Sequence, residues 1–164
     1  MTPLVARAQL NLVRRLVADF ERRRSSMQDL SQVQSTHIAI TALLRSIGHV
    51  FAKVDCADAE KARWARERWP EWSRDPIFRD FIEPGRNALL KEFGGLLGED
   101  SEALGNVAVV ADPGVPGGVR QVIDFRAEAA TDLRGEPIVP QMHSAIAFWE
   151  RNLREAETSK VFRT

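Results

Sequence analysis

Residues 75 to 93 constrain the fold most, because they form an apolar helical pattern that is interrupted in its middle. Asp75 can cap a helix, and Pro76 suits the first helical position, where no N–H is needed. Apolar residues then recur at helical spacing, namely Ile77, Phe78, Phe81, Ile82, Leu89, Leu90 and Phe93. Pro84 and Gly85 break this pattern, so we expect a kink there. The rest of the chain should be organised around this central helix.

Four further segments carry helical signals, at residues 2–24, 29–54 and 58–69 and from Pro137 onwards. In the first segment the expected buried face is Leu4, Ala8, Leu12, Leu16 and Phe20, with Val5, Val13 and Val17 beside it. In the second it is Val33, His37, Ile40, Leu44, Ile47, Phe51 and Val54. Gly48 would weaken this second helix unless a neighbouring helix packs closely against it. Pro70 should end the third helix, because proline biases the preceding residue away from helix.

Between these helices lies a segment with the character of a β-hairpin, at about residues 106–125. Two short runs with strand character flank a turn-forming stretch that is rich in proline and glycine. A hairpin alone is marginal in water, so it should lie on the helices or pair with another chain. The sequence therefore predicts a mainly α fold. We expect one domain over residues 1–164, an up-and-down bundle of about five helices with this hairpin inserted before the last helix.

Formal net charge is zero, so no global field favours nucleic acid or a membrane. The charge is nevertheless uneven along the chain. Residues 1–54 carry 8 Lys/Arg against 3 Asp/Glu, a net of +5, and residues 55–104 carry 8 against 12, a net of −4. These segments can attract each other within one chain or between two copies. With the free edges of the hairpin, this favours a homodimer.

The single cysteine, Cys56, excludes an internal disulfide and favours a reducing compartment. No apolar run approaches the roughly 20 residues of a membrane span, and the N-terminus lacks the pattern of a signal peptide. We therefore expect a cytoplasmic protein that does not contact a membrane.

Candidate chemistry is sparse. Asp55 and Asp58 flank Cys56 and would raise its thiol pKa, so we interpret the cysteine as structural. His37, His49 and His143 have no partners at metal-binding spacing, and we predict neither a metal nor a cofactor. His37 lies on an apolar stripe and is expected in the core. Arg45 and His49 are one helical turn apart and are candidates for a small polar binding site.

Arg86 and Asn87 follow the kink on a helix that is otherwise apolar. Together with the preceding charged helix and tryptophan-bearing connector, they resemble the HEPN superfamily of small helical-bundle proteins, over residues 29–93 and the last helix. In that superfamily an Arg, often followed by Asn, precedes a His, and two copies join these residues to cut RNA without a metal. Here Lys91, Glu92 and Phe93 stand where that His would fall. The resemblance therefore implies Arg86 and Asn87 as binding residues, without the usual acid/base.

Three hypotheses follow. The first is a dimeric, non-catalytic HEPN-like module that binds RNA, a nucleotide or a protein partner. The second is a metal-independent ribonuclease centred on Arg86, with His49 or Lys91 as a displaced base. The third is a structural subunit of a larger assembly, in which Arg86 and Asn87 only fix helices and a dimer seam.

Overall fold

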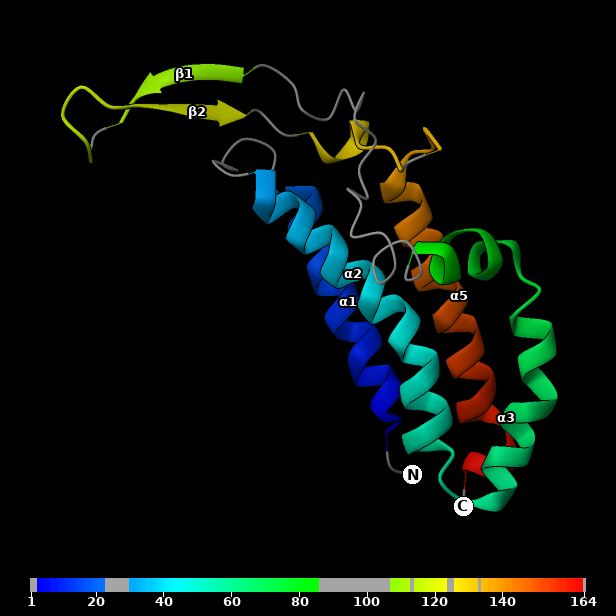
Figure 1. Ribbon diagram of the computed structural model, residues 1–164. Helices are drawn as coiled ribbons and strands as arrows, with labels where there is room; N and C mark the ends of the chain where they lie inside the picture. Colours follow the sequence, from blue (N-terminus) through cyan, green and yellow to red (C-terminus); the bar gives the residue numbers. More distant parts are fainter. Residues whose placement is uncertain are drawn as a thin grey trace.

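The computed structural model describes residues 3–22, 30–85, 107–112, 114–123, 126–132 and 134–163. These residues form a mainly helical bundle, as the sequence predicts, and helices α1, α2, α3 and α5 alternate in direction along its length (Figure 1). Their bounds are Val5–Arg22 for α1, Leu30–Val50 for α2, Ala59–Trp72 for α3 and Ile138–Thr158 for α5. Both chain ends lie at the same end of the bundle (Figure 1).

Helix α1 buries only part of the face that its sequence suggested. The buried residues are Ala6, Leu10, Val13, Val17 and Phe20. Ala8 is exposed and Leu12 is 39% exposed, although both belong to the expected face. A strict spacing of four residues overshoots one helical turn by about 40°, so such a row rotates away from the core within a few turns. The real stripe alternates steps of three and four and stays in register with α2 and α5.

Helix α2 buries the predicted stripe from Val33 to Phe51, and His37 lies in the core as expected. A π-helical turn, Phe51–Asp55, continues this helix, and Val54 falls outside the stripe with 53% of its surface exposed. The wider turn of a π-helix changes the residue spacing, which explains why the predicted pattern fails there. The carboxylate of Asp55 accepts hydrogen bonds from the backbone N–H groups of Val5 and Ala6, at 2.7 and 2.9 Å. The end of this turn therefore caps the first turn of α1.

Gly48 is a point of close packing between helices, as expected. A Cβ atom at this position would lie 2.9 Å from Cη2 of Trp149 on α5 and 3.3 Å from Cη2 of Trp69 on α3. Both indole rings therefore use the space that the missing side chain leaves. Gly85 makes a similar approach to α2, since a Cβ there would lie 2.6 Å from Cγ2 of Thr41.

Helix α3 does not end at Pro70, contrary to the prediction, but continues through it to Trp72. Asp58 caps its start by accepting a hydrogen bond from the N–H of Lys61 at 2.8 Å. Pro70 lies close to the other end, so it removes only one hydrogen bond of the helix. Trp72 is 3% exposed and packs with its ring 5.6 Å from that of Phe51 and 6.4 Å from that of Trp149. This anchoring holds the last turn of α3 in place.

The central segment begins as predicted, with Asp75 accepting a hydrogen bond from the N–H of Ile77 at 3.0 Å. A second π-helical turn, Phe78–Ile82, follows and buries Phe78, Phe81 and Ile82. The described part ends at Gly85, and residues 86–93 of the predicted helix lie outside the described residues. Phe78 contacts Phe148 and Trp149 of α5, with ring centroids 5.8 and 6.3 Å away.

The predicted hairpin is present before the last helix. Strands β1 (Val107–Ala111) and β2 (Val119–Ile123) pair antiparallel, with Val109 opposite Gln121. Gly117 in the turn has φ +73°, a conformation that favours glycine. The hairpin does not lie along the helices but extends sideways beyond the bundle (Figure 1). Val109 is 64% exposed and Val119 is 70% exposed.

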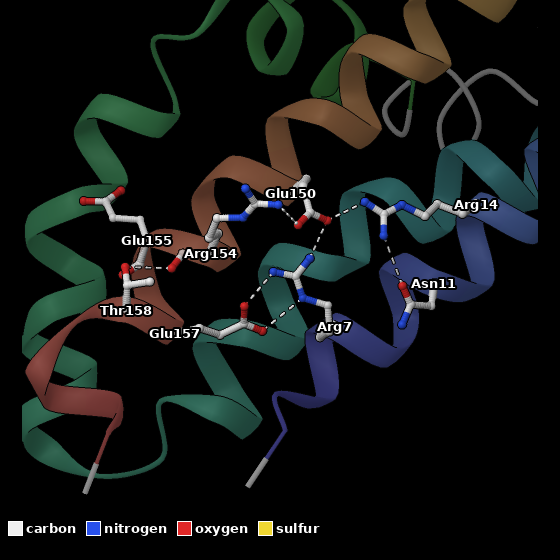
Figure 2. A network of polar contacts seen from close by, with 8 residues as sticks. All are labelled: Arg7, Asn11, Arg14, Glu150, Arg154, Glu155, Glu157 and Thr158. Carbon is white, nitrogen blue, oxygen red and sulfur yellow. Dashed lines mark hydrogen bonds and ion pairs between the residues drawn. The ribbon is translucent and has the colours of Figure 1, made fainter. Parts of the chain in front are cut away.

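A polar network joins the first and last helices (Figure 2). The Arg7 guanidinium donates to both oxygens of Glu157, at 3.0 and 2.8 Å, and to Glu150 at 2.5 Å. Glu150 also accepts hydrogen bonds from Arg14 and Arg154. The side chain of Arg7 is only 17% exposed, so water screens these pairs less than it screens pairs on an open surface. This network clamps α1 onto α5.

Candidate functional site

The residues that carry the family resemblance are not positioned by the structure. Arg86, Asn87 and Lys91 lie outside the described residues. The chain reaches them from Gly85, which packs on Thr41 of α2. His49, the proposed displaced base, lies eight residues farther along α2 than Thr41, a rise of about 12 Å. The described part of the chain therefore provides no geometric support for the ribonuclease hypothesis.

Arg45 and His49, by contrast, are brought together. Both line a pocket of about 370 Å³ between α2 and α3, which we call the α2–α3 pocket. Its walls come from three elements: α2, the π-helical turn after it, and α3. The lining residues are Arg45, Gly48, His49, Phe51, Ala52, Ala62, Ala65, Arg66, Trp69, Pro70 and Trp72.

The pocket is mostly apolar and aromatic. Trp69 is half-buried and turns one edge toward Gly48, so the missing side chain helps to make room for the indole. The Arg45 guanidinium lies 5.4 Å from the ring centroid of Phe78 and 6.0 Å from that of Trp69. A guanidinium at such distances from aromatic faces is attracted by the ring quadrupoles. These contacts fix Arg45 at the edge of an aromatic wall.

The basic side chains in the described lining of the pocket are not matched by acidic ones there. Arg45, His49 and Arg66 line it, and none of the described residues that line it is Asp or Glu. Arg66 is exposed, and no described carboxylate lies within ion-pair distance of it. An anionic group would therefore meet two guanidinium groups and an imidazole beside an aromatic surface. Arginine matches carboxylate and phosphate oxygens through paired hydrogen bonds.

The sequence had pointed to Arg45 and His49 but not to Arg66 as a site residue. The charged character of residues 58–69 made that helix look like a solvated surface. The sequence does contain one indication of Arg66 as a site residue, its three-residue spacing from Trp69, which places a cation beside an indole on one helical face. That spacing alone did not show that α2 lies opposite them.

Other reactive side chains offer little chemistry. Burial raises the pKa of the Cys56 thiol to about 12, with Asp55 and Asp58 adding to the effect. The thiol is therefore protonated at neutral pH and is a poor nucleophile. Burial lowers the pKa of His37 to about 4, so its imidazole is neutral in the core. Across the ranges that the structure describes, no three His, Cys, Asp or Glu side chains gather as a metal site would require.

A second, more open groove of about 540 Å³ runs between the start of the central segment and α5. An ion pair between Asp75 and Arg151, at 2.7 Å, forms part of its lining. The lining also contains Asp80, and each of the two carboxylates pairs with an arginine, Asp75 with Arg151 and Asp80 with Arg79. This groove is therefore less suited to a charged ligand than the α2–α3 pocket.

Comparisons with known proteins identify no family: the scan against protein-family models, the search of curated proteins and the search of solved structures each gave no match. Within the described part of the chain, none of the helices combines the length and the apolar character that crossing a bilayer requires.

Proposed function

We propose that this chain is a HEPN-like, non-catalytic binding module and that the α2–α3 pocket binds a nucleotide. The observation that carries the proposal is the composition of this pocket, an aromatic wall flanked by Arg45, His49 and Arg66, with no carboxylate among the lining residues that the structure describes. A nucleotide combines a planar base, which stacks on an indole, with a phosphate, which pairs with guanidinium groups. The pocket supplies both kinds of partner.

Size favours a nucleotide over the other two ligands considered. A pocket of about 370 Å³ falls in the range of small-molecule sites, roughly 300–1,000 Å³. Single-stranded RNA instead needs a groove that follows its backbone over several nucleotides. A protein partner needs a much wider contact area than a pocket of this size offers. RNA binding is therefore an alternative outcome of the test below.

Binding is tested by titrating the protein with adenosine 5′-monophosphate at low salt, followed by tryptophan fluorescence and calorimetry. We expect quenching of the indole emission, because the base stacks on Trp69. Arg66→Gln should weaken binding, since it removes one of the cations of the pocket. Arg63→Gln is the matched control, because Arg63 is exposed on the same helix and does not line the pocket.

Two results would contradict the proposal. One is the absence of any nucleotide binding at low salt. The other is equal affinity in wild type, Arg66→Gln and Arg63→Gln. If a short single-stranded RNA bound instead, with a steep salt dependence and no sensitivity to Arg66→Gln, the RNA-binding alternative would replace it.

The proposed module is a homodimer, and the hairpin supports this part of the proposal. The β1–β2 pair has two unpaired edges, and Val109 and Val119 expose most of their surface. A second copy that pairs along the β1 edge would extend the sheet and place its own side chains beside Val109. We expect light scattering to give about twice the 18.4 kDa of one chain. Val109→Lys should shift the protein toward monomer, whereas Val54→Lys, at an exposed site outside the hairpin, should not.

A further inference from the structure

One carbonyl on the wall of the α2–α3 pocket lacks the hydrogen bond that a helix normally supplies. Pro70 lies inside α3 and has no N–H. The backbone carbonyl of Arg66, four residues earlier, therefore does not receive the i→i−4 bond. Three residues later, the Trp69 carbonyl accepts a hydrogen bond from the N–H of Ser73 at 2.9 Å. The gap in the ladder is thus local to Arg66.

This gap lies on the side of α3 that faces the pocket. Arg66 and Pro70 are one turn apart and both line the pocket, and Trp69 lines it beside them. A helical carbonyl points along the axis toward the residue four positions later, so the Arg66 carbonyl lies on the strip between these two residues. A base stacked on Trp69 would bring its edge close to this strip.

We propose that the α2–α3 pocket selects a nucleotide whose base carries an exocyclic amino group, because that group donates a hydrogen bond to the backbone carbonyl of Arg66. This selection rests on the proposed nucleotide binding and adds the class of base. A helix carbonyl that lacks its protein donor normally takes its hydrogen bond from water. A ligand that displaces this water must donate a hydrogen bond in its place, or it leaves a desolvated acceptor without a partner.

The consequence is discrimination between two otherwise similar ligands. A purine with an amino group at position 6 supplies the donor, while an unsubstituted purine of nearly the same shape does not. The loss of one such hydrogen bond, with a carbonyl left unpaired, weakens binding about tenfold. Stacking on Trp69 and the phosphate contacts are the same for both ligands.

Pro70→Ala separates this proposal from the general one. Alanine restores the N–H at position 70, which then bonds to the Arg66 carbonyl and removes the free acceptor. Alanine is also the best helix former, so the variant should fold at least as stably as the wild type. Pro140→Ala on α5 is the matched control. Pro140 lies in the first turn of α5, does not line the pocket, and interrupts no hydrogen bond within that helix.

The experiment measures, by calorimetry on the intact chain, the affinities of adenosine 5′-monophosphate and of purine riboside 5′-monophosphate, which lacks the amino group. We expect wild type and Pro140→Ala to prefer the amino-bearing nucleotide about tenfold. Pro70→Ala should bind the two nucleotides equally, because its Arg66 carbonyl is already paired and neither nucleotide leaves it unsatisfied.

Equal binding of both nucleotides by the wild type would overturn the proposed selection while leaving nucleotide binding intact. A preference that survives in Pro70→Ala would also overturn it, because the Arg66 carbonyl is then satisfied. If neither nucleotide binds the wild type, both the selection and the proposed function fail together. Circular dichroism confirms that each variant keeps its helical content before the affinities are compared.

Discussion

Replacing Gly48 by alanine tests how closely the helices pack at the centre of the bundle. Helix propensity alone predicts a gain of about 1 kcal/mol, because alanine is preferred over glycine inside a helix. The structure predicts the opposite sign. The new Cβ would lie 2.9 Å from Cη2 of Trp149, a distance that real Cβ atoms essentially never show.

Trp149 cannot easily move away from this atom. It is completely buried, and its ring contacts those of Phe148 and Trp72, with centroids 4.9 and 6.4 Å away. Overpacking at such a site costs about 1–3 kcal/mol. After subtraction of the propensity gain, Gly48→Ala should lower the free energy of unfolding by up to about 2 kcal/mol. Gly48→Leu should lower it further.

The assay is urea denaturation followed by far-UV circular dichroism. A second variant, Trp149→Phe, removes the Cη2 atom and provides the partner for a double-mutant cycle. Gly48→Ala should cost less in the Trp149→Phe background than in the wild type, so the coupling energy is not zero. A higher midpoint for Gly48→Ala alone, with no coupling to Trp149→Phe, would refute the close-packing argument and leave only helix propensity.

Three further predictions concern stability. Burial lowers the pKa of His37 from about 6.5 in the unfolded chain to about 4 in the fold, so the unfolded state takes up a proton first as pH falls from 6.5 to 4, and about 3 kcal/mol of stability is lost. The urea midpoint should therefore fall less over this pH range for His37→Leu than for the wild type. Equal falls of the midpoint in both proteins would contradict the prediction. Asp55→Ala removes the cap of α1 and should lower the free energy of unfolding by about 0.5–2 kcal/mol, and Asp55→Asn should cost less. Equal urea midpoints for the wild type and Asp55→Ala would mean that water replaces the cap. Arg7→Met should cost about 1–3 kcal/mol, and less in high salt, because two partly buried glutamates lose their partner; an unchanged melting temperature at low salt would exclude the clamp.

Periodicity predicted helices well where the residue steps alternated between three and four. The stripe of α2 from Val33 to Phe51 is buried throughout its predicted positions, and α5 begins within one residue of the expected start. It failed where the step was constant, as for Ala8 and Leu12 of α1. The turn chemistry around Gly117 located the hairpin, because few other sequences suit that backbone. The direction in which the hairpin projects depends on tertiary structure, so it could not be predicted from the hairpin sequence alone.

The candidate site was only half predictable for a similar reason. Arg45 and His49 share a helical face, so their proximity follows from sequence spacing alone. Their meeting with Arg66 and Trp69 depends on how α3 folds back onto α2. The rule that proline ends a helix concealed this arrangement, because it placed the end of α3 before Pro70. Burial of Trp72 outweighs the single lost hydrogen bond, and a local rule does not include that tertiary contribution.

The contacts of α1 also bear on the order of events during synthesis. Helix α1 is synthesised before α2, α3 and α5, yet its cap comes from Asp55, and the partners of Arg7 are Glu150 and Glu157. The contact between Arg7 and Glu157 spans 150 positions of the chain. Such long-range pairing slows folding, because the intervening loop must close first. Helix α1 is therefore made before α5 but completed only with it, and until α5 emerges Arg7 lacks both of its glutamate partners.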